Sequence, residues 1–124
     1  VVAPATTSSH RAMVAATTRA ADRGEAGHIG LPGGKVDAGE SARDAALREA
    51  GEEGWFVEGI ADEPFHVATV EGKTVAWFAA TGARALLSYK EQGRIRPLAV
   101  PASDVAESGY GNDAAMAAWA ILPV

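Results

Sequence analysis

The segment LPGGKVDAGESARDAALREAGEEGW, residues 31–55, places a glycine turn directly before a stretch with helical character. Residues 32–34, Pro-Gly-Gly, predict a tight turn, because proline and glycine favour turn conformations. Ser41 followed three residues later by Asp44 resembles a capping box, with aspartate where glutamate or glutamine is usual. These local signals predict a helix over residues 41–53, entered through a loop.

Three glutamates, Glu49, Glu52 and Glu53, are the candidate functional residues of this predicted helix. They follow one another at the spacing i, i+3, i+4, which places them on one face of a helix. Like charges at that spacing destabilise a helix unless they are compensated, and hard cations such as Mg²⁺ prefer carboxylate oxygens. Such a run of acidic residues is ordinarily a solvated surface. The neighbouring residues are therefore needed to distinguish that surface from a cation-binding site.

Outside this segment, apolar runs separated by turns predict an α+β fold with helices packed on a sheet. Glu71-Gly72 lies between two apolar runs and is typical of a β-hairpin turn. Asn112 or Asp113 is expected to cap a last helix that reaches Ile121. The expected strands are residues 12–18, 29–31, 55–57, 65–70, 73–78 and 95–100, and residues 19–27 are expected to form a polar loop.

The composition is typical of a globular domain, with 124 residues of which 48% are hydrophobic. A net charge of −5 argues against binding to nucleic acid, and no apolar run approaches the ~20 residues that span a bilayer. The chain has no cysteine, which excludes disulfides, thiolate zinc sites and a cysteine nucleophile. We see no signal peptide, and we expect a cytoplasmic monomer or homodimer with one domain over residues 1–124.

Residues 34–53 resemble the Nudix box, G-x5-E-x7-R-E-U-x-E-E-x-G-U. The preceding Leu31-Pro32-Gly33 resembles the usual lead-in to that box. The resemblance, to MutT-like members in particular, implies a Nudix-type α/β/α sandwich in which helices flank a mixed β-sheet. The residues that match in register are Gly34, Glu40, Arg48, Glu49, Glu52 and Glu53.

The chain departs from the box at the end of the predicted helix. Trp55 stands where the box has its last glycine, and Gly54 comes one place early. Ala50 is a small residue at an aliphatic position. All three lie outside the acidic positions, so they put the helix exit and its packing in question more than the metal site.

The resemblance implies a site for Mg²⁺, with Mn²⁺ as the alternative cation. Glu52 and Glu53 would be the main ligands, and Glu49 would be a third ligand or the general base that activates water. The Gly33 carbonyl would complete the inner shell. MutT-like members often add a carboxylate from a later loop, for which Glu91 is the candidate, although an ordinary acidic loop residue is an equal interpretation.

Four residues around the acidic positions have further implied roles. Arg48 counts among the catalytic residues and would also pair with Glu40, holding the loop against the helix. Lys35 is a candidate for contact with a substrate phosphate, but it is equally well a solvated lysine. The Gly34 amide is a second candidate for such a contact.

The function implied is cleavage of a phosphoanhydride in a nucleoside triphosphate or another nucleoside diphosphate-linked small molecule. Two alternatives stay open: hydrolysis of ADP-ribose, nucleotide sugars or other diphosphate conjugates, and a nucleotide-sensing module without catalysis. A Ser-His-Asp mechanism is disfavoured, because there is no Gly-x-Ser-x-Gly elbow and the three histidines are scattered. Trp77, Phe78 and Tyr89 are candidates to stack on a base, although such residues are more often core.

Overall fold

A computed structural model of the chain describes residues 1–5, 12–19 and 28–123. The loop expected over residues 19–27 lies outside these ranges, apart from Arg19. Strands and helices occur together in one chain, which confirms the α+β class. In chain order they are β1 (Met13–Arg19), β2 (Ile29–Gly30), α1 (Ala42–Glu52), β3 (Trp55–Ile60), β4 (His66–Val70), β5 (Lys73–Trp77), β6 (Ala80–Ala85), β7 (Ile95–Pro101), α2 (Ala102–Ala106) and α3 (Asn112–Ala120).

The strands pair antiparallel in three groups: β1 lies between β2 and β7, β3 pairs with β6, and β4 pairs with β5. Residues 1–5 connect the first two groups. Val2 forms a parallel bridge with Ala79, and Pro4 forms an antiparallel bridge with Val14. Further backbone hydrogen bonds join residues 1–5 to both neighbours. The result is a mixed sheet that runs across β7, β1, residues 1–5, β6 and β3.

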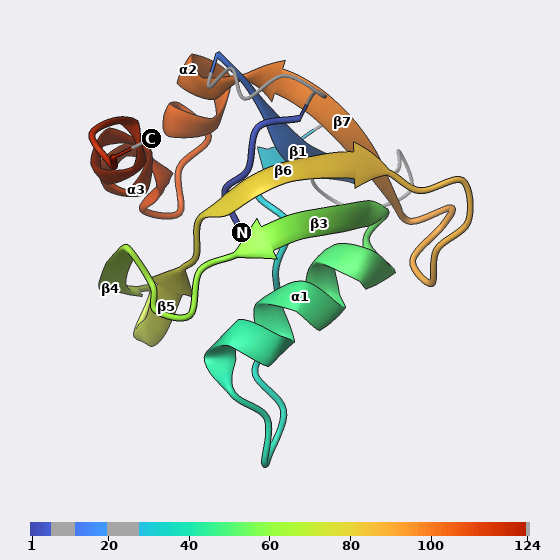
Figure 1. Cartoon of the computed structure of the whole chain (residues 1–124), viewed down its shortest axis with the longest axis horizontal. Coiled ribbons are helices and arrows are strands. Elements are labelled where there is room, and N and C mark those ends of the chain that lie inside the picture. Colours follow the sequence, from blue (N-terminus) through green and yellow to red (C-terminus); the bar gives the residue numbers. More distant parts are fainter. Residues whose placement is uncertain (6–11, 20–27, 124) are drawn as a thin grey trace.

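One face of this sheet is covered by α1. Ala50 of α1 and Trp55 of β3 pack in a buried cluster with Ala15 of β1 and Ala83 of β6. Figure 1 shows α1 running alongside β3, with α2 and α3 grouped together away from it. The face of α1 turned away from this cluster is therefore free to carry polar groups.

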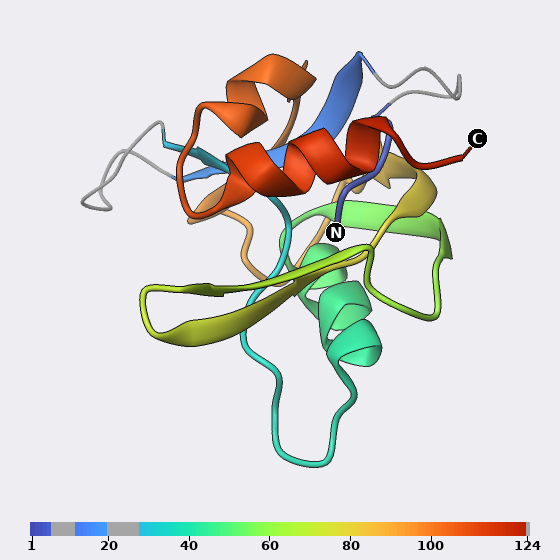
Figure 2. The same ribbon diagram turned by 90° about the vertical axis from the view of Figure 1, so that its left-hand side faces the viewer.

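The other face of the sheet is covered by α2 and α3. Met116 and Trp119 of α3 share a buried cluster with Val14 and Val100 from β1 and β7. Successive strand residues point to opposite faces, which is why Val14 lies in this cluster and Ala15 in the other. Figure 2 shows α3 lying across the molecule on the side opposite α1. These two cores confirm an α/β/α sandwich with a mixed sheet flanked by helices.

Local signals in the sequence placed two elements correctly. The Ser41 side chain caps α1 by accepting a hydrogen bond from the Asp44 amide at 3.1 Å. The β4–β5 hairpin turns at Glu71 and Gly72, whose φ angles of 50° and 78° suit a tight two-residue turn. Both predictions are confirmed.

The expected cap of the last helix was wrong. Gly111, with a φ of 73°, occupies the cap position of α3, and no side chain in the described part of the chain forms a cap hydrogen bond there. Asn112 is instead buried, and its side chain accepts a hydrogen bond from the Trp77 indole at 3.2 Å. The helix ends at Ala120, one residue before Ile121. Strand β6 and the short helix α2 were not predicted. Within the described residues, no helix is long and apolar enough to cross a membrane.

Candidate active site

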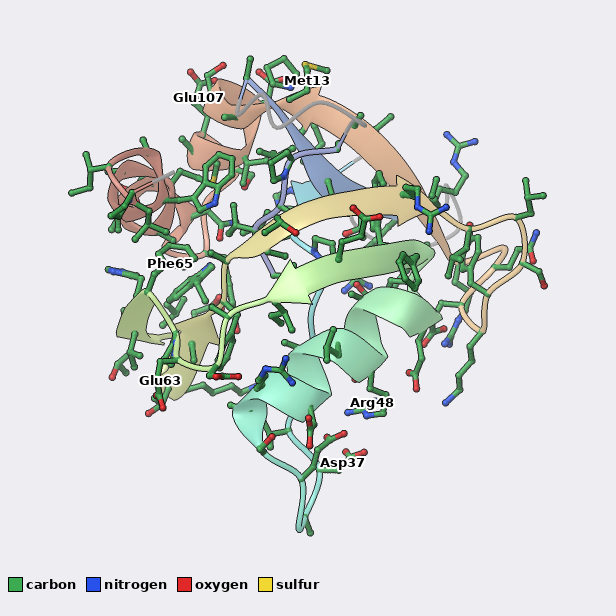
Figure 3. The ribbon with its side chains drawn as sticks, in the orientation of Figure 1. Met13, Asp37, Arg48, Glu63, Phe65 and Glu107 are labelled. Carbon is green, nitrogen blue, oxygen red and sulfur yellow. The ribbon has the colours of Figure 1, made fainter. Side chains whose placement is uncertain are left out.

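Arg48 ties α1 to the entry loop, which we define as residues 33–40. Its Nε and Nη2 donate to the two carboxylate oxygens of Glu40 at 2.8 and 3.0 Å. Nη2 also donates to the Lys35 carbonyl at 3.0 Å and lies 3.4 Å from an Asp37 carboxylate oxygen. Figure 3 shows Arg48 on the side of α1 that faces Asp37. The hydrogen bonds from Arg48 hold the pKa of Glu40 below its ordinary value.

The remaining nitrogen of Arg48 points along the helix towards two other carboxylates. Nη1 lies 3.0 Å from Glu49 Oε1 and 3.4 Å from Glu52 Oε2. Its partners, Glu40 first among them, raise the pKa of Arg48 above its ordinary value. One guanidinium thus braces the entry loop and also neutralises part of the acidic face, by which we mean Glu49, Glu52 and Glu53.

Glu53 is the buried member of the acidic face, with 7% of its surface exposed. Burial raises its pKa to about 7, although the Gly33 amide, which donates to Oε1 at 3.2 Å, acts in the opposite direction. The nearby Glu49 raises the pKa further. Two neighbouring carboxyl groups thus disfavour each other's ionisation, even though Arg48 lies beside Glu49.

Glu49 packs directly against the backbone of the entry loop. A Cβ atom built on Gly34 would lie 2.4 Å from Glu49 Cδ and 2.6–2.7 Å from its two oxygens. A side chain at position 34 would therefore displace the Glu49 carboxylate from the place it occupies here. This close approach explains why the turn before α1 carries glycine at the first position of the motif.

Glu52 faces a second loop, the β6–β7 loop, residues 86–94. The Glu91 amide donates to the Glu52 carbonyl at 2.8 Å, and Lys90 Nζ lies 3.7 Å from Glu52 Oε2. The Glu91 carboxylate pairs with Arg94. The fold therefore brings Glu91 beside α1, as the sequence suggested, but turns its carboxylate towards Arg94.

The sequence that forms this arrangement matches a known protein family. The family model for the NUDIX domain matches residues 1–72, more than half of the chain. The chain belongs to the Nudix family. It is accordingly a hydrolase of acid anhydrides in phosphorus-containing compounds, and the acidic face of α1 lies within its Nudix box.

Solved structures share the fold at low sequence identity. A MutT structure from a study of Aliivibrio salmonicida and Vibrio cholerae superimposes with a TM-score of 0.67 at 22% identity, covering 98% of this chain and 95% of that one. The Nudix hydrolase RenU of M. smegmatis gives 0.54 at 20% identity, covering 99% and 83%. The E. coli ORF135 protein gives 0.53 at 20% identity, covering 99% and 92%. No curated protein matched the chain in the sequence comparison.

The departure from the Nudix box at Trp55 has a structural reason. Gly54 has a φ of 106° and lets the chain leave α1, so the glycine one place early performs the exit. Trp55 then enters the core with 3% of its surface exposed, and its indole donates to the Ala16 carbonyl at 2.8 Å. The replacement thus anchors the start of β3, directly after α1, to β1.

The donor set fits a hard divalent cation in its chemistry, because it consists of carboxylate oxygens beside a backbone turn. Within the described residues, however, no three His, Asp or Glu side chains are grouped closely enough to hold a metal ion. The acidic side chains lie apart because they have different partners. Glu52 points towards Arg48 and Lys90, whereas Glu53 points towards the Gly33 amide. The Gly33 contact seen here is made by its amide, and the ligand role of its carbonyl stays a prediction.

The other candidate residues differ in how much of each side chain is exposed to contact a substrate. Trp77 and Phe78 are buried, with 4% and 3% exposed, so neither offers a free face for a base. Tyr89 is half-buried in the β6–β7 loop, and its hydroxyl donates to the Ile95 carbonyl at 2.9 Å. Lys35 is exposed on the entry loop, with its carbonyl held by Arg48. Lys90 was not singled out from the sequence, because its approach to Glu52 depends on the folded loop.

Proposed function

We propose that the chain is a Mg²⁺-dependent pyrophosphohydrolase of nucleoside triphosphates or other nucleoside diphosphate-linked substrates, with Mn²⁺ as a substitute. One observation carries the proposal: Glu49 and Glu52 in the last turn of α1 and the C-cap residue Glu53 lie close enough for Glu49 to raise the pKa of the buried Glu53, although Arg48 and Lys90 approach Glu49 and Glu52. A chain with a net charge of −5 needs a cation between these acids and a phosphate substrate.

Glu52 and Glu53 would hold the cation, together with the Gly33 carbonyl and a carboxylate from Glu49 or Glu91. When bound, the cation supplies charge neutralisation of the diphosphate and polarisation of its phosphorus–oxygen bonds. The burial that raises the pKa of Glu53 shows how strongly this pocket disfavours an uncompensated carboxylate. Cation binding at Glu53 would therefore release a proton near neutral pH.

The chain's own groups would activate water and orient the substrate. Glu49, or a neighbouring carboxylate, accepts a proton from the attacking water as its oxygen bonds to phosphorus. The anhydride phosphorus–oxygen bond breaks, and the departing phosphate keeps the electron pair. Arg48 holds Glu49 at 3.0 Å, so it positions the base, and the Gly34 amide and Lys35 are candidates for contact with phosphate oxygens.

We propose a nucleoside triphosphate as substrate, with the monophosphate and pyrophosphate as products. The single domain over residues 1–124, a cytoplasmic location and a monomeric or dimeric state stay predictions. A substrate panel tests the function: nucleoside triphosphates, ADP-ribose, nucleotide sugars and dinucleoside polyphosphates, each with Mg²⁺ and with chelator. Chromatographic identification of the products names the bond that is cut. Turnover of one class with Mg²⁺ supports the proposal. No turnover of any class, with Mn²⁺ also tried, favours a nucleotide-sensing module.

A further inference from the structure

The β6–β7 loop is attached to the end of α1 that carries Glu52. Leu86 donates from its amide to the Gly54 carbonyl at 2.8 Å, and Glu91 donates to the Glu52 carbonyl at the same distance. Within the loop, the Tyr89 hydroxyl is fixed to the Ile95 carbonyl. These bonds lie on both sides of Lys90, so its backbone position beside the acidic face is determined by the fold.

Lys90 and Arg48 neutralise Glu52 in different ways. Arg48 is fully engaged, with nitrogens directed to Glu40, Glu49, Glu52 and the Lys35 carbonyl. Among the residues that the structure describes, Lys90 pairs with Glu52 alone, at 3.7 Å, and 71% of its side chain is exposed. An exposed ion pair of this kind is weak, and an ammonium has three donors on a flexible stem. Lys90 can therefore leave Glu52 at little cost.

We propose that Lys90 is a substrate-positioning residue that exchanges partners during binding. In the metal-free protein it pairs with Glu52. When a divalent cation takes Glu52, the ammonium is repelled from that carboxylate and binds an oxygen of the substrate's phosphate chain. The proposal rests on the proposed function, because it assumes that the cation and the phosphates occupy the acidic face.

The exchange predicts opposite effects of one substitution on two ligands. Lys90→Met removes a positive charge beside the cation site, so Mn²⁺ alone should bind about two- to fivefold more tightly. The same variant loses a charge-assisted contact to phosphate, so pyrophosphate with saturating Mn²⁺ should bind about tenfold more weakly. Lys90→Arg keeps the charge and should stay close to the wild type for both ligands.

Titration calorimetry with these two probes tests the proposal on the whole chain. Lys73→Met is the matched control, because Lys73 is an exposed lysine in the distant β4–β5 hairpin. It should bind Mn²⁺ and pyrophosphate as the wild type does. Opposite shifts in Lys90→Met, absent from Lys73→Met, support the exchange. Unchanged pyrophosphate binding, or Mn²⁺ binding equal to that of the control, overturns it.

Hydrolysis by the wild type separates this inference from the proposed function. If the wild type binds Mn²⁺ and cleaves a substrate while Lys90→Met behaves like the control, the role of Lys90 is wrong and the function stands. If the wild type binds neither Mn²⁺ nor pyrophosphate, the metal site on the acidic face is wrong, and the role of Lys90 fails with it.

Discussion

At the scale of single residues, Gly34 is a position where the backbone of the entry loop packs against Glu49. In Gly34→Ala the new methyl group would lie 2.4 Å from Glu49 Cδ, so the carboxylate has to move. We expect Mn²⁺ affinity and turnover to fall together, each by about tenfold or more, since small misplacements of reacting groups are costly. Calorimetry and an initial-rate assay measure the two effects.

Gly51→Ala is the matched control on the same helix. Apart from its own helix backbone and chain neighbours, a Cβ at Gly51 meets no atom of the described residues within 4 Å, so the acidic face stays in place. The free energy of unfolding should rise by about 1 kcal/mol, because alanine favours a helix interior over glycine. Equal turnover in Gly34→Ala and the wild type would show that the contact with Glu49 is unimportant.

Glu53 should make the metal-free protein less stable as the pH rises. Its pKa is raised by burial from 4.5 to about 7, so between these values the unfolded chain loses the proton while the folded chain keeps it. The contribution of Glu53 to the free energy of unfolding therefore falls across this range, by at most about 3 kcal/mol, and levels off above pH 7. Urea unfolding with chelator from pH 4 to pH 8 measures the slope.

Glu53→Gln should flatten that slope, because glutamine does not titrate and its oxygen can still accept the Gly33 amide. Above pH 7 the variant should be more stable than the metal-free wild type. An identical slope in both proteins would show that another group titrates.

The proximity of Glu49, Glu52 and Glu53 could be predicted from sequence, because their spacing brings them together at the end of one helix. The residues that contact these glutamates could not be predicted from sequence. Lys90 lies thirty-seven positions beyond Glu53, and its contact depends on how the β6–β7 loop folds back onto α1. The burial that raises the pKa of Glu53 also depends on packing between distant segments.

At the scale of elements, the end of α1 departs from the Nudix box: Gly54 provides the turn out of the helix, and Trp55 fills the core at the position of the box glycine. Restoring the glycine of the Nudix box with Trp55→Gly removes a buried indole and its hydrogen bond to the Ala16 carbonyl. We expect the free energy of unfolding to fall by at least about 3 kcal/mol, the cost of emptying a large core site. Trp55→Phe should lose about 1 kcal/mol, mainly for the hydrogen bond. Thermal unfolding that ranks the two variants equally would contradict this role.

The start of α3 depends on Asn112, which accepts from the Trp77 indole at 3.2 Å and donates to the Ser108 hydroxyl at 3.1 Å. Asn112→Ala leaves the buried indole nitrogen unpaired, so we expect a loss of about 1–3 kcal/mol in unfolding free energy. The exposed Asp113→Ala, in the same helical turn, is the control and should change stability by less than about 0.5 kcal/mol. Equal losses would restore the expectation that Asp113 caps the helix.

Elements with strong local signals were predictable, and those without were not. The Ser41 cap and the Glu71-Gly72 turn are determined by a few adjacent residues, so α1 and the β4–β5 hairpin were found. Strand β6, with the sequence ATGARA, contains small and polar residues that show no clear apolar alternation. Helix α2 has five residues, too few for a helical period to emerge.

At the scale of the whole molecule, the sheet separates the larger hydrophobic core on one face from helix α1 on the other. One face packs on α2 and α3 in the larger core, and the other packs on α1, whose C-terminal end carries Glu49, Glu52 and the C-cap residue Glu53. Residues 1–5 complete the sheet between β1 and β6, which no local pattern could reveal because the contact joins distant segments.

The central claim is that the acidic face of α1 performs metal-dependent hydrolysis. The most direct test is the initial rate of phosphoanhydride cleavage on the best substrate, with Mg²⁺ and with chelator, in the wild type and Glu52→Gln. Glu58→Gln is the control, because Glu58 is a half-exposed glutamate on β3 that pairs with Arg84. We predict Mg²⁺-dependent turnover that falls about 100-fold or more in Glu52→Gln and is unchanged in Glu58→Gln. Equal rates in Glu52→Gln and the wild type would contradict the claim.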